Sequence, residues 1–353
     1  MPVSRLMKGA EEFLTNQVSP LANAMDTDSG LLHGALNGLC EAGLICLRRP
    51  AEFGGPGFVD RDFRDFQELV ARHSGALAFL QTQHQSAVSL LSKGEPSPLR
   101  DQLLHQAHQP DELIGIGFSQ LRRAGPPVLR AEATAGGYRI DGHLPWATGF
   151  GMFRHLLLAA ALPDGTAVFG VIPFESAPGV QYSEPMRLAA MQAAQTVTAE
   201  FDGYQLDASK VLFLREPNWI HRNDMINVTL QGFFAIGCAR AGLELAIGGA
   251  SRRKSTDALR DLASLEGEMA QCRDQLGRSQ ALGDETTDER LQLRAWAIDL
   301  MLRCTSAAIV ATGGAANSTD HAAQRVYREA MVFAVSAQTT QIMLATLSRL
   351  AAR

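Results

Sequence analysis

The sequence predicts an α+β protein that is mainly α-helical: an N-terminal helical domain, a middle domain of antiparallel strands forming a barrel or sandwich, and a C-terminal four-helix bundle. Three observations predict this order. Apolar residues recur at helical spacing up to about residue 110, hairpin signals fill residues 112–210, and long helical patterns return after about residue 217. We therefore place the domains at residues 1–111, 112–215 and 216–353. With 353 residues and 46% apolar content, the chain can bury a large core.

Apolar residues three and four positions apart predict two helices in the N-terminal part. They are Leu31, Leu32, Ala35 and Leu39 in the first helix, and Phe63, Phe66, Leu69 and Val70 in the second. Between them lies the segment 49–57, which contains three glycines and two prolines. Because glycine and proline at this density exclude a helix, we expect a shaped loop there.

Turn signals divide the middle part into short strands. Gly136–Gly137, Asp141–Gly142 and Pro163–Gly165 are typical of tight turns between antiparallel strands. Tyr138 and Ile140 alternate with polar neighbours, as in a half-buried strand. The apolar runs 156–162 and 167–172 predict a more deeply buried hairpin.

The C-terminal pattern predicts long helices that pack closely. Glycines mark places where another helix can approach: Gly232, Gly237, Gly242, Gly248 and Gly249. A loop is expected at Gly283–Glu285, after which Thr286 and Glu289 form a capping box for a helix that ends at Gly313–Gly314. One last helix is expected to carry a single apolar stripe made of Val326, Ala330, Phe333, Ala337, Leu344 and Leu347.

Composition and charge exclude several classes of function. The net charge of -5 and the absence of a basic stripe argue against nucleic acid as a partner. The five cysteines form no Cys-x-x-Cys pair, so we expect buried free thiols, with no disulfide framework and no metal site. The first residues lack the apolar stretch of a signal peptide, and no apolar run reaches about 18 residues. We therefore expect a cytoplasmic protein with no membrane partner.

Three local motifs, together with the order of helical, β and helical parts, carry a resemblance that covers essentially the whole chain. Residues 41–44 (Glu-Ala-Gly-Leu) precede Pro-Ala-Glu-Phe-Gly-Gly at 50–55, residues 137–149 contain Gly-Tyr-Arg-Ile-Asp-Gly-His-Leu-Pro-Trp-Ala-Thr-Gly, and Gly313–Gly314 precedes Arg-Val-Tyr-Arg-Glu-Ala at 325–330. These motifs resemble the acyl-CoA dehydrogenase family, which has a Pro-x-x-(Phe/Tyr)-Gly-Gly loop, a strand with Trp-Ile-Thr and an Arg-Asp-Ala helix. The resemblance implies the family's fold.

The resemblance also implies a flavin cofactor, with FAD favoured over FMN. By analogy, Trp146 packs near the flavin ring and the Thr148 hydroxyl bonds close to flavin N5; an aromatic plane and a hydroxyl suit these roles. The strand ending in Phe118 and Ser119 falls where the family bonds the flavin pyrimidine edge. In the family, a loop like Gly313–Gly314 reaches the FAD of a neighbouring subunit, where free backbone N–H groups can receive a pyrophosphate. A helix C-cap is the alternative for these two glycines.

The sequence departs from the family at its substrate-binding and catalytic motifs. The family's Glu-Pro-x-x-Gly-Ser-Asp, which helps to hold acyl-CoA, is replaced by residues 120–125, in which Arg122 and Arg123 either meet a phosphate or form a solvated pair. The Phe-Gly that grips the adenine half of FAD is missing at 252–256. Ungapped spacing puts Ala337 where the catalytic Glu belongs, and a methyl group cannot take a proton.

No other residue fills the place of the missing base by motif. Some family members carry the Glu on the first bundle helix, but the corresponding region, 228–231, has no carboxylate. Related flavin monooxygenases place a His where this chain has Phe333 and Ser336. The remaining candidates are His84, His143, His155 and Glu244, each of which is also explained as a solvated or structurally bonded side chain. The catalytic residue is unknown at this stage.

Three functions follow from the resemblance. The first is an FAD-dependent oxidoreductase that moves hydride from a substrate carbon to flavin N5, on a small molecule or an acyl thioester that is not a standard acyl-CoA. The second is a flavin monooxygenase of the same fold, and the third is a non-catalytic scaffold. We expect a homodimer or homotetramer, because the Ala- and Gly-rich last helices expose more apolar surface than one bundle needs. An electron-transfer partner is implied for the first function.

Overall fold

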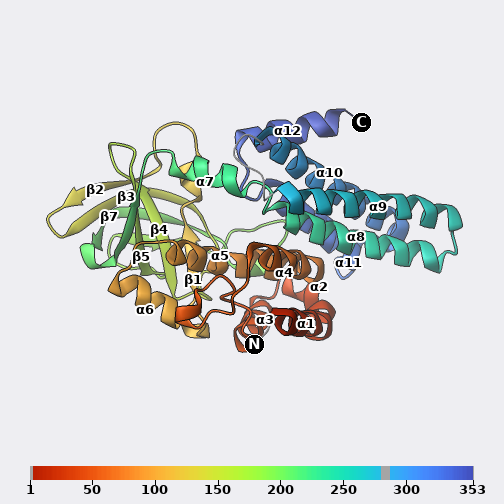
Figure 1. The fold of residues 1–353 in the computed structure, drawn as a ribbon, viewed down its shortest axis with the longest axis horizontal. Helices are drawn as coiled ribbons and strands as arrows, with labels where there is room; N and C mark the ends of the chain where they lie inside the picture. Colours follow the sequence, from red (N-terminus) through yellow and green to blue (C-terminus); the bar gives the residue numbers. More distant parts are fainter. Residues whose placement is uncertain (1–2, 280–286, 353) are drawn as a thin grey trace.

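The computed structural model describes residues 3–279 and 287–352, and it has helices, strands and helices in chain order (Figure 1). The two helices predicted in the N-terminal part are present as α3 and α4. The elements of this part are α1 (Val3–Phe13), the π-helical turn η1 (Leu14–Val18), η2 (Ser19–Leu21), α2 (Ala22–Met25), α3 (Ser29–Glu41), η3 (Ala51–Phe53), α4 (Asp60–His73), α5 (Gly75–Ser92), α6 (Pro98–Gln106) and η4 (Pro110–Glu112).

Side-chain caps and glycines set the boundaries of these helices. Asp28 caps α3 and Ser74 caps α5, each accepting a hydrogen bond from the backbone N–H three residues on. The loop predicted at 49–57 is confirmed, with only the short η3 inside it. A Cβ at Gly55 would lie 1.6 Å from the carbonyl oxygen of Arg49, so only glycine fits the turn that closes this loop.

The middle part is a mixed sheet of eight strands in the order β6-β7-β3-β2-β4-β5-β8, with β1 paired to β4 outside this path. The predicted hairpin is β4 with β5, and most pairings are antiparallel as expected. Two pairings, β1 with β4 and β2 with β4, are parallel, which turn signals alone did not predict. The elements are β1 (Ile114–Gly117), η5 (Ser119–Arg122), β2 (Leu129–Thr134), β3 (Gly137–Ala147), β4 (His155–Ala161), β5 (Ala167–Pro173), β6 (Val180–Tyr182), η6 (Gln192–Ala194), β7 (Val197–Asp207), η7 (Ala208–Lys210) and β8 (Val211–Arg215).

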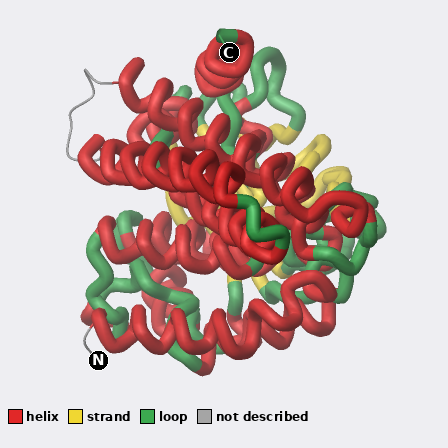
Figure 2. The backbone as a smooth tube through the Cα atoms, turned by 90° about the vertical axis from the view of Figure 1, so that its right-hand side faces the viewer, coloured by secondary structure: helices red, strands yellow, loops and turns green. Residues whose placement is uncertain are grey.

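The C-terminal part is the predicted helical bundle, which lies to one side of the sheet and hides much of it in the view of Figure 2. Its elements are α7 (Trp219–Asn227), α8 (Gly232–Arg252), α9 (Thr256–Ser279), α10 (Thr287–Thr312), η9 (Gly313–Asn317), α11 (Ala322–Val335) and α12 (Thr340–Ala351). The predicted loop at 283–285 and the Thr286 half of the predicted capping box lie outside the described residues.

Glycines bring α8 close to its neighbours, as the sequence predicts. A Cβ at Gly237 would lie 2.3 Å from the carbonyl oxygen of Glu68 on α4, and one at Gly242 would lie 2.9 Å from the backbone of Cys304 on α10. Helices can approach this closely only where a side chain is absent. Both contacts place α8 between α4 and α10.

Among the described residues, two helical stretches are long and apolar enough to cross a membrane by length and composition alone: α8, and α10 together with η9. They pack against each other at the centre of the bundle, and 72% and 50% of their most apolar windows are buried. This is the packing of core helices. All five cysteines are buried and free, as expected, and burial raises the pKa of the Cys46 and Cys272 thiols to about 12.

The prediction of one last helix is wrong. The chain forms two helices, α11 and α12, which are separated at 336–339, where Ala337 has a φ of 50°. The Thr339 hydroxyl accepts a hydrogen bond from the N–H of Ile342 and starts α12. The expected apolar stripe therefore splits: Phe333 is buried, whereas Leu344 and Leu347 are exposed.

The last two helices both carry large apolar side chains that are exposed. These side chains, each between 37% and 57% exposed, are Tyr327, Met331 and Val335 on α11 and Met343, Leu344, Leu347 and Leu350 on α12. Exposed apolar side chains that gather on one helix are typical of an interface between subunits.

We predict that the protein is a dimer or a dimer of dimers at micromolar concentration, because these apolar side chains are costly to leave in water. Replacing Leu344 and Leu347 together by Lys should shift the sedimentation profile toward monomer. Val59→Lys is the matched control, because Val59 is an isolated exposed apolar residue on the opposite end of the chain. A parent protein that sediments as a stable monomer would contradict the prediction.

Candidate functional site

A pocket of about 840 Å³ lies where the sheet meets the helices. Its walls come from α5, β1, η5, the end of β3, the loop 188–191, α7, the start of α8, and α11 with the turn before α12. This volume falls within the range of about 300–1,000 Å³ that is usual for small-molecule and cofactor sites. Segments from all three parts of the chain therefore build one site.

The structure brings together four of the six predicted site residues on one wall of this pocket: Phe118, Ser119, Trp146 and Thr148. Trp146 is 41% exposed, although its neighbours on β3 are buried. A β-bulge between Leu144 and Ala147 explains this orientation, because it breaks the alternation of the strand and turns the indole toward the pocket.

The hydroxyl groups of this wall use only part of their hydrogen-bonding capacity within the protein. Thr148 is 5% exposed, and its Oγ1 lies 3.0 Å from the Oγ1 of Thr196, so each hydroxyl keeps a further hydrogen-bonding position. No hydrogen bond among the described residues uses the Ser119 hydroxyl. This wall therefore offers an open aromatic plane flanked by two hydroxyls.

Ala337 lines the same pocket, on the turn between α11 and α12. Arg294 of α10, only 1% exposed, donates from Nη2 to the carbonyl oxygens of Phe333 at 3.1 Å and Ser336 at 3.3 Å, and so holds the start of this turn. Burial lowers the pKa of Arg294 to about 9. The turn is thus held from behind, with the methyl group of Ala337 at the pocket wall.

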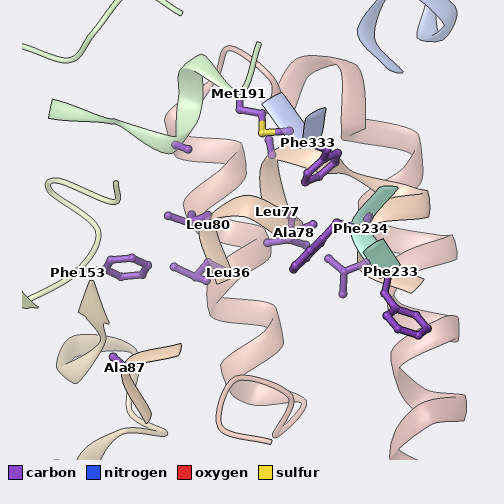
Figure 3. Packing of buried hydrophobic residues seen from close by; sticks show 14 of the residues in the cluster. Leu36, Leu77, Ala78, Leu80, Ala87, Phe153, Met191, Phe233, Phe234 and Phe333 are labelled. Atoms are coloured by element: carbon purple, nitrogen blue, oxygen red, sulfur yellow. The ribbon is translucent and has the colours of Figure 1, made fainter. Parts of the chain in front are cut away.

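Aromatic packing forms the floor of the pocket on the bundle side. Phe234 of α8 and Phe333 of α11 are stacked, with ring centroids 5.7 Å apart and an interplanar angle of 13°. Figure 3 shows both rings beside each other, with Met191 of the loop before β7 next to Phe333. The family-related monooxygenases carry a His in this region, and the structure has no imidazole among the described lining residues.

The loop that carries Met191 is tied to both ends of the chain. Asp26, which is 1% exposed, accepts from the N–H of Met191 at 2.6 Å, and its other oxygen pairs with Nη1 of Arg328 at 2.6 Å. Arg328 also donates to the carbonyl oxygen of Ala189. This joint fixes the loop 188–191 as a wall of the pocket.

Charged side chains gather on the α5 and η5 side of the pocket: Arg48, Lys93, Arg122, Arg123 and Asp224. Arg122 and Asp224 form a two-point ion pair, with Nε and Nη2 at 2.7 and 2.9 Å from the two carboxylate oxygens. The sequence offered a phosphate contact or a solvated pair for Arg122 and did not indicate this partner, because Asp224 lies 102 positions away on α7. Asp224 is the one carboxylate among the described lining residues.

Gly313 and Gly314 lie outside the described lining of this pocket. Gly313 has a φ of 76° and directly follows α10, so it occupies the position of a helix C-cap. Arg253 donates to the carbonyl oxygens of Ala311 and Thr312 at the same helix end, at 2.5 and 3.1 Å. Contact of this loop with the FAD of a neighbouring subunit stays a prediction.

The four candidate bases also lie outside the described lining, and each has a structural partner. Glu244 pairs with Arg72 at 2.9 Å, His143 with Glu200 at 2.6 Å, and His155 with Glu112 at 2.8 Å. His84 is fully buried and bonded to the backbone of Ala107 and Ile114. These contacts support the structural explanation for all four.

The wall around Trp146 fits the ring of a flavin. A large indole left 41% exposed toward a pocket is costly unless a planar partner covers it. Hydroxyl groups, such as those of Thr148 and Ser119, can donate to or accept from a heteroaromatic edge in either of its redox states. The donors present therefore match the cofactor that the sequence resemblance implies.

The chain has the acyl-CoA dehydrogenase fold. A crystal structure of butyryl-CoA dehydrogenase from Megasphaera elsdenii matches 99% of this chain and 98% of its own, with a TM-score of 0.81 and 17% identity. A nitrososynthase from Micromonospora carbonacea var. africana matches 99% of this chain and 95% of its own, with a TM-score of 0.78 and 19% identity.

In sequence, the chain is similar to a 3-(aryl)acrylate reductase from Clostridium sporogenes, with 18% identity over 96% of this chain and 95% of that protein. No protein-family model matches the sequence. The predicted fold and the resemblance to acyl-CoA dehydrogenases are thus confirmed at the level of the fold.

Proposed function

We propose that this protein is an FAD-dependent oxidoreductase that exchanges hydride between a substrate carbon and flavin N5. The pocket carries this proposal, because it combines an open indole and two hydroxyls on one wall with a substrate-sized space toward Ala337 on the other. A flavin bound there would supply the two-electron chemistry, since its N5 accepts or donates hydride.

The residues of this chain would have distinct roles around that cofactor. Trp146 would cover one face of the ring and exclude water from it, and Thr148 and Ser119 would bond its polar edges. Phe234 and Phe333 would close the bundle side of the substrate space. The Arg294-supported turn would set the depth of the pocket at Ala337.

The lack of an available carboxylate base in the described lining indicates that the substrate is not a standard acyl-CoA. Desaturation of an acyl thioester needs a carboxylate that takes the α-proton. Ala337 offers a methyl group, and the one described carboxylate of the lining, Asp224, is bound at both oxygens by Arg122. In the reverse direction, hydride from the reduced flavin would add to the β-carbon of an unsaturated acid, and the resulting enolate would take its α-proton from water, so no carboxylate has to remove a proton. The similar protein from Clostridium sporogenes is named as a reductase.

Reconstitution followed by spectroscopy tests the proposal. We expect the purified protein to bind FAD, or less favourably FMN, with a shifted flavin absorption band, and the reduced form to be reoxidised by an α,β-unsaturated acid acceptor under nitrogen. A protein that stays colourless with either flavin would support the scaffold function instead.

A flavin monooxygenase is the second candidate. The observation that favours it is the lack of an uncommitted carboxylate among the described lining residues, because oxygen chemistry needs no α-proton base. The nitrososynthase of the same fold lends structural support. Oxygen consumption that requires reduced flavin from a separate reductase, together with an oxygenated product, would favour this function over hydride exchange.

We predict that Trp146→Ala and Thr148→Val each weaken FAD binding by about 1–3 kcal/mol, through lost packing area and a lost hydroxyl bond. Fluorescence titration of FAD gives the dissociation constants. Thr134→Val on the exposed end of β2 is the control and should bind FAD as the parent does. Unchanged affinity in both pocket variants would remove these residues from the cofactor site.

We predict that Ala337→Glu folds with a stability loss below about 1.5 kcal/mol, because the new side chain enters the pocket rather than a sealed core. Ala330→Glu is the matched control on the same helix pair, since Ala330 is completely buried and should lose several kcal/mol. Urea denaturation compares the two. Equal losses would show that residue 337 is packed between helices, which would overturn its assignment to the pocket.

A further inference from the structure

Two cations of the pocket have no anionic partner in the part of the chain that the structure describes. Lys93 and Arg123 line the pocket, and neither lies within ion-pair distance of a described carboxylate. Arg48, by contrast, pairs with Asp60 at 2.7 Å, and Arg122 pairs with Asp224. Both side chains are exposed, and the described lining carries more cations than carboxylates, which favours an occupant that brings a negative charge.

Helix α5 presents a stripe of hydroxyl groups to the same pocket. Thr82, Ser86, Ser89 and Lys93 follow one another at intervals of four, three and four residues, which places them on one face of the helix. The hydroxyls of Thr82 and Ser86 take part in no hydrogen bond among the described residues, and that of Ser89 receives only a long bond of 3.5 Å from Arg48.

Amide side chains add a second polar row. Asn223, Asn227 and Gln231 line the pocket at intervals of four residues, from α7 to the residue before α8. The amide of Asn227 donates to Asn223, whereas the amide of Gln231 takes part in no hydrogen bond among the described residues. Both rows belong to elements other than β3, which carries Trp146, and they are available to a substrate in the same pocket.

An alkyl chain is a poor occupant of this space. It would strip water from the hydroxyls of α5 and the Gln231 amide without replacing the lost hydrogen bonds. A molecule with hydroxyl groups along its length would replace those bonds, and an anionic end would meet Lys93 and Arg123.

We propose that the substrate of this pocket is an anionic molecule that carries several hydroxyl groups, whose hydroxyls are bound by Thr82, Ser86 and Gln231 and whose anion is bound by Lys93 and Arg123. The proposal rests on the proposed function, which provides the flavin wall, and it names the substrate class for the remaining space.

Matched phosphate esters separate hydroxyl recognition from charge. Glucose 6-phosphate and hexyl phosphate have the same charged group and similar length, but only the first carries hydroxyls. With the FAD-loaded protein, calorimetric titration is expected to give at least about tenfold tighter binding of glucose 6-phosphate. Equal or tighter binding of hexyl phosphate, or no saturable binding of glucose 6-phosphate, would overturn the proposal.

Variants then assign the contacts. Thr82→Val with Ser86→Ala should reduce the preference for glucose 6-phosphate over hexyl phosphate to about twofold or less, because only hydroxyl contacts are removed. Ser92→Ala is the control on the same helix, since Ser92 lies outside the described lining and its hydroxyl bonds the carbonyl oxygens of Arg48 and Val88. A preference that survives in the double variant would contradict the proposed contacts.

Lys93 and Arg123 could bind the FAD pyrophosphate instead of a substrate anion, because both groups are negatively charged. Lys93→Gln with Arg123→Gln should weaken glucose 6-phosphate at least about tenfold and leave the FAD dissociation constant unchanged. Lys210→Gln, an exposed cation outside the described lining, is the control. A loss of FAD affinity with unchanged glucose 6-phosphate affinity would assign the two cations to the cofactor and overturn the proposal. A parent protein that binds no flavin would instead refute the proposed function.

Discussion

Replacing Glu329 by Ala is expected to destabilise the protein by about 3–5 kcal/mol, because it leaves a buried arginine without its counter-ion. Glu329 is completely buried, and its Oε1 accepts from Nη1 of Arg325 at 2.6 Å and from the N–H of Gly75 at 3.0 Å. Arg325 is 6% exposed and has Asn23 as its other side-chain partner. Loss of the carboxylate therefore leaves the Arg325 charge and the Gly75 N–H without this partner at the same time.

The helix α9 provides a matched control for this ion pair. Asp274 and Arg278 have the same i,i+4 spacing and an N–O distance of 2.7 Å, but both side chains are more than half exposed. Asp274→Ala should therefore cost less than about 0.5 kcal/mol. Urea denaturation of both variants gives the comparison. A loss below about 1 kcal/mol for Glu329→Ala would mean that Arg325 finds another partner or water in the folded state.

Lowering the pH from 7 to 4 is expected to remove about 3 kcal/mol of stability through His84 alone. Burial lowers the pKa of His84 from 6.5 to about 4. The geometry explains the direction, because Nδ1 accepts from the N–H of Ile114 at 2.9 Å and Nε2 lies 2.9 Å from the carbonyl oxygen of Ala107. The neutral ring satisfies both neighbours, whereas a second ring proton would meet the N–H of Ile114.

Whether stability rises or falls with pH depends on which state of the chain, folded or unfolded, binds the proton more readily. Well above pH 6.5, His84 is neutral in the folded and the unfolded chain, and it contributes no pH dependence. Between pH 6.5 and 4, the unfolded chain binds a proton that the folded chain excludes, so stability falls as the pH falls. His84→Gln keeps a donor and an acceptor but cannot titrate, and it should flatten this part of the curve.

A second histidine makes that comparison necessary. Burial also lowers the pKa of His73 to about 4, so the parent protein carries two groups that act in the same direction. The difference between the parent and His84→Gln isolates one of them, because His73 is common to both. Parallel stability curves from pH 7 to 4 would contradict the role of His84.

The sequence predicts the order of parts well, because periodicity and turn residues are local properties. Glycine at 237 and 242 predicts that another helix comes close, and α4 and α10 occupy those places. The sequence does not predict the interruption between α11 and α12 at 336–339, because alanine rarely adopts the left-handed conformation that Ala337 has there. An alanine continues a helix in any propensity scale, and tertiary contacts from Arg294 decide otherwise here.

For the site, the motif resemblance predicts the wall that carries Trp146 but not the charged and hydroxyl-bearing side of the pocket. Phe118, Ser119, Trp146 and Thr148 were identified by motif, and they share a pocket. The pair of Arg122 with Asp224 had no signal, since the two residues meet only after α7 folds over η5. The hydroxyl stripe on α5 does have a signal in the sequence, because Thr82, Ser86 and Ser89 repeat at helical spacing.

The joint between Asp26, the loop at 189–191 and Arg328 has a consequence for the order in which the pocket forms during folding. Its three contacts join positions that are 165, 302 and 139 residues apart in the chain. Contacts between such distant positions close large loops, whereas the N-terminal helices and the sheet can fold earlier as units. The wall at 188–191 is therefore expected to become fixed only when the last bundle helices have packed against the first helices. A flavin that arrives earlier would meet an unfinished pocket, so cofactor binding is expected to follow the assembly of all three parts of the chain.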